Sequence, residues 1–600
     1  QGLCSRVMAQ GKGKPPGEGE FKSFADLIRS RGGEPKPAED PTEGRGWMVD
    51  GQDERFQGEE LDLLPDLGAG PRARIAARPR AFGAMDTGPP FYRDADSEEM
   101  GLLRSFRVRT VFLPDVMGEV EGLPADPRPS DAEGRQDLRG ATIFTIDGKD
   151  ARDYDDAIAI EALGDGRFEV GVHIADVSHY VRPQTRLDDE ALARGTSVYL
   201  PDQVVPMLPE ALSNGLCSLV PDRDRLAISV HMVFNAQGER ESYRVAKSIL
   251  RSVRRCTYQE VQELLDGADT EGAARLEDLR VPLEHFQVWT RRQQSLRDAK
   301  GSLRIDSRER KFVFGPDHEV QAIVDYPKYF SNTLIEETAL AANQAVGDYF
   351  RERGLPTIYR VHPEKDPEEI ERIAKMLEEH GLHVPLKDRL TGRDVGRLIR
   401  AARRKPNAEA LIPRIMGLVE RALYEVKDHE DVAQHFGLAR EAYLHFTSPI
   451  RRYPDLIVHR WLSDLLARGE EAEAELRGGT WVDDLTEVAG HCSLQSEMAA
   501  MAETAVGDLK VCQFMAPHVG TKHEGRVVRV SRGGIEVHLP EFHVGGFLPL
   551  RAIGARPKLK GPTLTVQAGR RSLSFTEGYP IAVRIQDVDF LKLQVLMELG

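Results

Sequence analysis

Cysteine is scarce in this chain, and long hydrophobic runs are missing. The cysteines are odd in number, far apart and form no C-x-x-C pair: Cys4, Cys217, Cys256, Cys492 and Cys512. This pattern indicates neither a disulfide framework nor a zinc ribbon. No stretch approaches the roughly 20 apolar residues that span a bilayer, and the first residues, QGLCSRVMAQ, lack the apolar core of a signal peptide. We therefore expect no membrane segment and a cytoplasmic location.

Positive charge is also in deficit, since the formal net charge is −16. Such a balance argues against a protein whose whole surface coats nucleic acid, so a polyanion would need a local basic path. One stretch differs from the rest: residues 518–600 carry twelve lysines and arginines against seven acidic residues. The length predicts about four domains, and the 40% hydrophobic content suffices for ordinary globular cores.

The most informative segment is the acidic loop TIDGKDARDYDDAIAI between Thr145 and Ile160. It brings four aspartates close together in sequence: Asp147, Asp153, Asp155 and Asp156. Like charges raise one another's pKa and resist joint ionisation unless a cation neutralises them. Oxygen-only ligands favour Mg²⁺ or Mn²⁺. A solvated acidic face is the common alternative, whereas an EF-hand fits poorly because the acids do not alternate around a central glycine.

The residues around this loop predict strands. Thr142 to Ile146 is β-branched and aromatic, and after the loop Ile158 and Ile160 alternate with small residues up to the turn Gly164-Asp165-Gly166. The chain then alternates again from Phe168 to Ile174. The carboxylates should therefore lie on a loop held between two strands.

The C-terminal basic stretch predicts a small β-barrel. In GRVVRVSRGGIEVHL, apolar residues alternate on both sides of Gly533-Gly534, which indicates a hairpin. Further short strands are expected around Phe547, over 572–575 and over 581–597. An OB-fold with a basic face for single-stranded nucleic acid is the expected form, although many β-barrels bind nothing charged.

Two helices are indicated in the mixed α/β middle of the chain. Asp366 is a cap followed by Pro367, and the helix should end before Gly381. A second helix is expected over 497–510, with its methionines in the core. Glycine and proline are frequent in residues 1–95, which we expect to be partly helical or partly disordered. The expected units are a small N-terminal module (1–95), a linker (96–135), a mixed α/β domain (136–512) and a barrel (518–600).

Several strings together resemble the ribonuclease II/ribonuclease R family of exoribonucleases, from Thr142 to the C-terminus. They are TIDGKDARDYDDA, RGTSVYLPDQVVPMLPEALSNGLCSL, LIEETALAAN, HFTSPIRRYPD and the terminal barrel. The resemblance implies an α+β multidomain protein with a mixed α/β RNB catalytic core and an S1-type OB domain. It also implies processive 3′→5′ hydrolysis of single-stranded RNA to nucleoside 5′-monophosphates with Mg²⁺, Mn²⁺ being possible. We expect a monomer that acts in RNA turnover without an obligatory protein partner.

The resemblance also assigns roles near the acidic loop. Asp147 and Asp156 should hold metal, Asp153 should complete the site, and Asp155 should be the least dispensable. Four aspartates are enough to hold two divalent ions about 4 Å apart, the arrangement that assists phosphodiester hydrolysis. Arg451 matches the arginine that approaches the scissile phosphate, a role that suits a planar guanidinium.

Further matches fall outside the loop. Glu503 matches a glutamate close to the active site, Tyr199 a tyrosine that packs on the 3′-terminal nucleotide, and Glu336 a contact to the ribose 2′-hydroxyl. Ordinary structural roles compete with these: a surface arginine for Arg451, a helix-surface glutamate for Glu503, a core tyrosine for Tyr199 and a helical salt bridge for Glu336.

The chain departs from the family pattern in two places. Ribonuclease II relatives have a second stacking aromatic where this chain reads Ser302-Leu303-Arg304-Ile305-Asp306. Arg304 or Phe312 could replace it, so the length of the final product is open. The N-terminal region lacks the sequence of cold-shock domains, and we expect a smaller RNA-contacting module there. No lysine-rich tail follows the barrel, which favours the ribonuclease II type.

Two other functions stay open. One is an inactive RNA-binding regulator, whose mark would be loss of one or more of the aspartates, and none is missing here. The other is a phosphodiesterase indifferent to the sugar.

Overall fold

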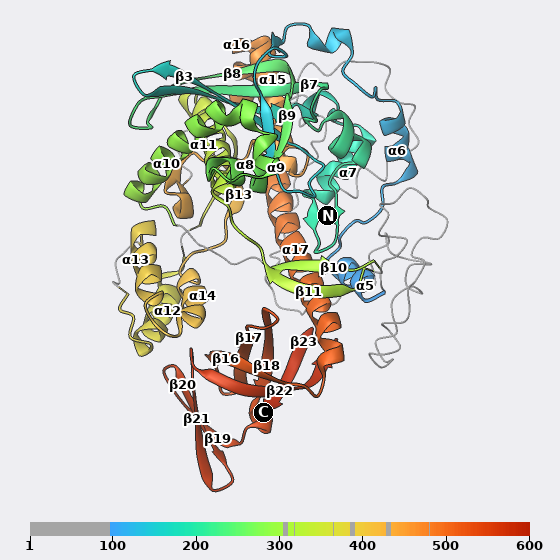
Figure 1. Cartoon of the computed structure of the whole chain (residues 1–600). Coiled ribbons are helices and arrows are strands. Elements are labelled where there is room, and N and C mark those ends of the chain that lie inside the picture. Colours follow the sequence, from blue (N-terminus) through green and yellow to red (C-terminus); the bar gives the residue numbers. More distant parts are fainter. Residues whose placement is uncertain are drawn as a thin grey trace.

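The computed structural model describes residues 97–600, except 304–309, 317, 364, 385–389, 428–433 and 479–480. The N-terminal module predicted for 1–95 and the predicted RNA contact Arg304 lie outside the described residues. Figure 1 shows a large α/β core, a group of three helices beside it and a C-terminal barrel, with one long helix running from the core to the barrel.

The core is built on a seven-stranded sheet in the order β1-β8-β7-β4-β3-β2-β9. Strands β3, β4, β7 and β8 form an antiparallel run, so the alternating segments predicted on both sides of Asp165 do pair, with Ile158 opposite Val172. The strands of the sheet are β1 Gln136–Asp137, β2 Phe144–Asp147, β3 Asp156–Gly164, β4 Arg167–Ala175, β7 Asp224–Phe234, β8 Arg240–Arg251 and β9 Arg254–Thr257.

Helices pack on this sheet and bury the tryptophans of the described part of the chain. Helices α10 and α11 contact β3, β4 and β7, and α15 contacts β8. Trp289, Trp461 and Trp481 are fully buried in this core. The helices of the core and its edges are α5 Ser97–Ser105, α6 Pro114–Glu121, α7 Arg186–Arg194, α8 Tyr258–Leu265, α9 Glu271–Ala274, α10 Arg280–Lys300, α11 Phe330–Glu352, α15 Tyr453–Arg468, α16 Glu470–Arg477 and α17 Val482–Met515.

The group of three helices has its own apolar core. Helix α12 (Pro367–Glu379) begins as predicted, because the Asp366 carboxylate accepts the Glu368 backbone N–H at 2.8 Å. Leu377, Leu398 and Ile415 are among its buried residues. The other helices are α13 Gly392–Ala402 and α14 Ala408–Met416, and the short strands of the chain are β5 Val198–Tyr199, β6 Val204–Val205, β10 Arg310–Phe314, β11 Val320–Asp325, β12 Thr357–Val361, β13 Leu423–Lys427, β14 Gln434–His435 and β15 Arg440–Glu441.

The predicted C-terminal barrel is confirmed as a closed five-stranded barrel. Its strands are β16 Lys522–Val530, β17 Gly534–Leu539, β18 Val544–Pro549, β22 Pro580–Asp589 and β23 Gln594–Leu599. They close in the order β16-β17-β18-β23-β22, a five-stranded closure of the OB type. The β16–β17 hairpin turns where Gly533-Gly534 predicted it, with Val530 opposite Ile535.

A second, smaller sheet is inserted between β18 and β22. It consists of β19 Ala555–Lys560, β20 Thr563–Ala568 and β21 Arg571–Thr576. The strand predicted over 572–575 therefore exists, but it pairs in this inserted sheet and not in the barrel. Figure 1 shows the inserted sheet projecting from the barrel.

Two expectations need correction. The stretch 96–135, expected to be a linker, contains helices α5 and α6, and Met100 and Leu103 of α5 are buried. The helix predicted over 497–510 is the much longer α17, and its buried face is Ala499, Ala502 and Val506. The reason is that α5 and the strands β5 and β6 pack on these small residues.

Among the residues described, no helix is long and apolar enough to cross a membrane.

Candidate active site

The four aspartates of the acidic loop lie at the ends of two inner strands of the central sheet. Strand β2 ends at Asp147 and β3 begins at Asp156, and the two strands are antiparallel neighbours with Phe144 opposite Ile158. The acidic loop joins the end of β2 to the start of β3 on the same side of the sheet. The prediction that two strands hold this loop is confirmed.

Asp155 is tied to the distant segment that contains Arg451. The Asp155 Oδ1 atom accepts the Ile450 backbone N–H at 2.9 Å, and Oδ2 lies 3.6 Å from Arg451 Nε. The carboxylate is buried, whereas the Arg451 side chain is 42% exposed. Burial raises the pKa of Asp155 well above its ordinary value, and the Arg451 charge opposes that rise. Asp155 can therefore hold Arg451 in place while part of the arginine side chain stays exposed.

The other loop aspartates are held in conditions that oppose their ionisation. Burial, and then the charge of Asp156, raise the pKa of Asp147 to about 8. Burial raises the pKa of Asp156 to about 6 and also raises that of Asp153. The buried Oδ2 atom of Asp147 has no hydrogen-bond partner in the described part of the chain. A bound cation would relieve both the repulsion and the missing partner, although no three His, Cys, Asp or Glu side chains among the described residues are already arranged as a metal site.

Tyr199 and Glu503 meet Asp153 in the same place. The Tyr199 phenol oxygen lies 3.4 Å from Asp153 Oδ2, and the Tyr199 backbone N–H donates to Glu503 Oε1 at 2.7 Å. Tyr199 is 40% exposed, which does not fit a plain core tyrosine. Strand β5 is also fixed to the arginine segment, because the Ser197 N–H donates to the Arg451 carbonyl at 3.0 Å. Residues from the loop, β5, α17 and the Arg451 segment thus converge.

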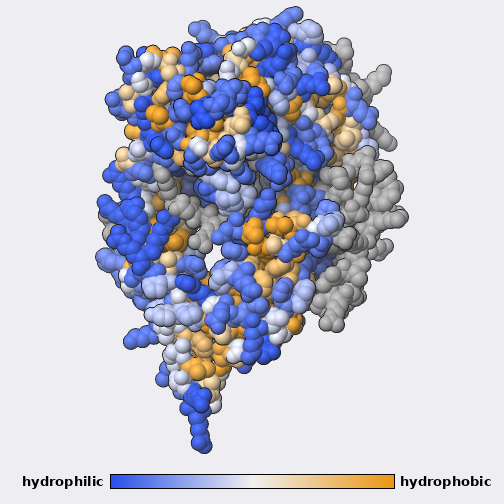
Figure 2. All heavy atoms as spheres, viewed as in Figure 1, coloured by the Kyte–Doolittle hydropathy of each residue, from blue (hydrophilic) through white to orange (hydrophobic). Residues whose placement is uncertain are grey.

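Two adjacent cavities lead from this place towards the barrel. The smaller, of about 590 Å³, is lined by Tyr199, Phe312 and Glu503. The larger, of about 1460 Å³, lies between α11, α14 and the barrel. Arg310 and Tyr326 line both cavities, which are therefore neighbours. Figure 2 shows the molecular surface hollowed between the core and the barrel.

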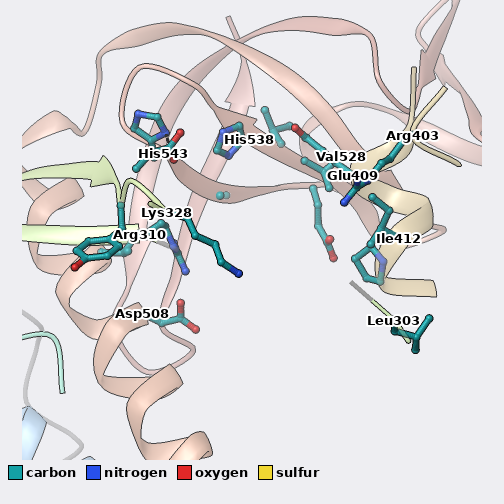
Figure 3. A pocket seen from close by; sticks show the side chains of 18 of the residues that line it. Leu303, Arg310, Lys328, Arg403, Glu409, Ile412, Asp508, Val528, His538 and His543 are labelled. Carbon is teal, nitrogen blue, oxygen red and sulfur yellow. Dashed lines mark ion pairs between the residues drawn. The ribbon is translucent and has the colours of Figure 1, made fainter. Parts of the chain in front are cut away.

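Figure 3 shows the larger cavity from close by. Arg310 and Lys328 enter it from one side, and Arg403, Glu409 and Ile412 face it from the other, with His538 and His543 of the barrel region above. Basic and acidic side chains therefore both line this space, and the carboxylates of Glu409 and Asp508 stand among the basic groups. The lining as a whole is not basic, so the local basic path stays a prediction.

Glu336 lies on the wall of the larger cavity, but it also has a protein partner. Its Oε1 atom accepts from Arg297 Nη1 at 2.9 Å, and the same nitrogen donates to Glu337 at 2.7 Å. Both expectations for Glu336, an RNA contact and a salt bridge, are therefore compatible with its position. The ion pair joins α10 and α11, whereas a helical salt bridge would lie within one helix.

Phe312 and Tyr199 both line the smaller cavity, so Phe312 is available as a second stacking aromatic. Tyr326, Arg310 and Lys328 also line the cavities, and the sequence analysis did not single them out. For Tyr326 and Lys328, the signal that could have indicated them is DYPKYF (325–330), where a lysine stands among aromatic residues after a strand.

A family model described as RNB domain matches residues 135–468. Because this match covers more than half of the chain, the chain belongs to the RNB domain family. Ribonuclease R of Thermotoga maritima is 37% identical over 444 residues, which are 74% of this chain and 61% of that protein. Ribonuclease R 1 of Lactococcus lactis is 33% identical over 503 residues, 83% of this chain and 60% of that protein. The chain therefore spans about three fifths of the length of these relatives.

A solved structure of similar fold is that of Mycoplasma genitalium RNase R in complex with ribose methylated single-stranded RNA. Its TM-score is 0.73 at 21% identity, and the match covers 84% of this chain and 78% of that chain. The resemblance to the ribonuclease II/ribonuclease R family is confirmed. The preference for the ribonuclease II type is not confirmed, because these matches are with ribonuclease R.

Proposed function

We propose that the protein is a processive 3′→5′ exoribonuclease that hydrolyses single-stranded RNA to nucleoside 5′-monophosphates and acts in RNA degradation. The observation that carries the proposal is the convergence of Asp155 with Arg451, and of Asp153 with Tyr199 and Glu503, next to cavities that lead to the barrel. Action as a monomer in the cytoplasm stays a prediction.

Each side chain would have a separate task. The exposed Tyr199 ring would stack on the last base, and Arg451 would contact the phosphate that is cleaved. Glu503 would fix Tyr199 by accepting the Tyr199 backbone N–H, and Asp155 would hold the Arg451 side chain. Asp147 and Asp156, with Asp153 and Asp155, would hold Mg²⁺ or Mn²⁺. When bound, these ions would supply an activated water and stabilise the charge on the phosphate.

The proposal is tested with 5′-labelled single-stranded RNA and Mg²⁺. The expected products are mononucleotides and one short labelled fragment. A ladder of internal fragments without mononucleotides would reject an exonuclease. Removal of divalent ions with EDTA should stop product formation, and Mg²⁺ or Mn²⁺ should restore it.

Replacing Tyr199 by alanine should weaken the binding of short single-stranded RNA. Loss of one stacking contact costs about 1 to 3 kcal/mol, which corresponds to about a 5- to 150-fold loss of affinity. Tyr199→Phe is the matched control, because it keeps the ring and loses only the hydroxyl near Asp153. Affinity is measured by fluorescence anisotropy in EDTA. Equal losses in both variants would show that the ring does not stack on a base.

Replacing Glu336 by glutamine should reduce the preference for RNA over DNA of the same sequence. Glutamine can still accept a hydrogen bond from the 2′-hydroxyl but lacks the charge. A hydrogen bond to a charged group contributes about 1.5 to 3 kcal/mol and one to a neutral group about 0.5 to 1.5 kcal/mol, so the ratio of the two kcat/KM values should fall about 5- to 10-fold. Glu368→Gln on the exposed side of α12 removes the same charge as a control. If Glu336 serves only to pair with Arg297, hydrolysis of RNA and DNA will fall by the same factor.

A further inference from the structure

The sheet β19–β21, inserted between the barrel strands β18 and β22, carries an unusual charge. Between residues 551 and 576 there is no aspartate or glutamate. Six basic side chains occur in the same stretch, and all are exposed: Arg551, Arg556, Lys558, Lys560, Arg570 and Arg571. In a chain of net charge −16, this is a concentrated positive surface.

These basic side chains make no ion pair with any residue that the structure describes. Many exposed arginines elsewhere do have a carboxylate partner, such as Arg167 with Glu241 at 2.6 Å and Arg372 with Glu369 at 2.7 Å. The charge of the inserted sheet is therefore not balanced locally and remains available to an anionic partner.

The two faces of the inserted sheet have opposite character. Cross-strand pairing places Leu564 opposite Phe575 and Val566 opposite Leu573, and this face packs on the apolar core of the barrel. The strand alternation sends the neighbouring residues to the other face. That face should carry lysines and hydroxyls: Lys558, Lys560, Thr563, Thr565, Gln567, Ser572, Ser574 and Thr576.

The open face is arranged in rows across the three strands. Lys558 is opposite Thr565, which is opposite Ser574, and the two hydroxyl oxygens lie 3.1 Å apart. Lys560, Thr563 and Thr576 form the next row, with the two threonine hydroxyls 3.0 Å apart. Lysines and hydroxyls are side chains that contact phosphates and sugars, and this face has no aromatic residue on which a base could stack.

We propose that the open face of β19–β21 binds the phosphate backbone of the RNA outside the cavities, upstream of the segment that enters them. This inference rests on the proposed function, since it assumes that RNA is the substrate. The contact would be independent of sequence and would hold a long substrate between successive cleavages. Figure 2 shows hydrophilic residues at the tip of the projecting end below the barrel, with apolar residues directly above the tip.

The test uses the full chain with Lys558→Gln and Lys560→Gln combined. The matched control is Arg128→Gln combined with Lys300→Gln, which removes two exposed positive charges from outside the barrel. Affinity is measured in EDTA over a series of salt concentrations. One RNA of about 8 nucleotides lies within the site size of a single OB-fold, and a second of about 30 nucleotides can reach further.

The lysine variant should bind the longer RNA about tenfold more weakly. The plot of log K against log salt should also become shallower, by about 1.4, because two phosphate contacts are lost and each contact to a single strand contributes about 0.7 to the slope. The shorter RNA should bind as it does to the wild type. The proposal is overturned if the longer RNA binds the lysine variant and the control variant equally well. It is also overturned if both RNAs lose affinity equally. A third outcome against it is a variant that binds both RNAs as the wild type does but binds phosphatidylserine vesicles more weakly.

The outcome separates this inference from the proposed function. A wild-type protein that neither binds nor degrades RNA would remove the proposed function. If the wild type degrades RNA but the lysine variant binds the longer RNA with unchanged affinity, only the role of the inserted sheet is wrong.

Discussion

Replacing Asp155 by asparagine should lower turnover of single-stranded RNA by at least about 100- to 1,000-fold, the range seen when one preorganised polar group is removed from an active site. RNA affinity should stay nearly unchanged. The physical reason is local: the asparagine side chain would keep an oxygen that accepts the Ile450 N–H, but it would lose the negative charge that faces Arg451. The lost charge lies beside Arg451 and the proposed cations, close to the reacting phosphate. It therefore lowers the rate of cleavage, whereas the contacts to the rest of the bound strand are unchanged.

The control for this variant is Asp165→Asn in the β3–β4 turn. Asp165 is exposed and has a φ of +51°, a conformation that asparagine also tolerates. The control loses the same charge from the same sheet without touching the site. Turnover and affinity are measured on the same labelled RNA. An unchanged turnover in Asp155→Asn would remove Asp155 from the mechanism, and a wild type that binds RNA without any turnover would favour the inactive RNA-binding regulator.

The acidic loop could be predicted from the sequence because its members are neighbours in the chain. The strands around it could also be predicted, since Phe144 to Asp147 and Asp156 to Gly164 follow simple alternation. The contact between Tyr199 and Glu503 could not, because the two residues are 304 positions apart and meet only through packing of β5 on α17. For them, only the family resemblance indicated a shared site.

The errors have physical causes of the same kind. Helix α5 packs on the small residues of α17 and so determines which face of α17 is buried. The periodicity of a single helix cannot show which neighbouring element will cover which of its faces. The strand β21 was recognised, but its partner β20 was not, because Gly561 and Pro562 indicate a loop. Local pattern predicts that a strand exists better than it predicts its neighbour.

A second large effect is expected where the barrel meets the group of three helices. Arg414 of α14 makes a two-pronged ion pair with Glu577, at 3.0 Å and 2.8 Å, and the Glu577 side chain is fully buried. The same carboxylate accepts the Val530 N–H and the Asn407 amide, each at 3.3 Å. Replacing Arg414 by methionine should destabilise this junction by about 3 to 5 kcal/mol, because the buried carboxylate loses its arginine and keeps as a basic neighbour only His380, whose Nε2 lies 3.6 Å away, among the described residues.

Hydrogen exchange of the backbone amides measures this effect locally. A loss of that size should raise the opening equilibrium of the barrel by between about 100-fold and several thousand-fold, beginning with the Val530 amide. Tryptophan fluorescence should change little, because Trp289, Trp461 and Trp481 are in the core and residues 518–600 contain no tryptophan. The control is Arg421→Met, which breaks the exposed ion pair with Glu497 and should cost no more than about 1 kcal/mol.

The double variant Arg414→Met with Glu577→Gln decides between two explanations of that loss. If the buried charge without its arginine is the cause, glutamine removes the charge, can still accept the Val530 N–H, and should recover part of the stability. If the cause is the lost packing of the arginine stem, the double variant will be no more stable than the single one. Because Pro413 and Ile412 of α14 line the larger cavity, loosening this junction should also weaken binding of long RNA, and recovery of stability in the double variant should restore that binding in parallel.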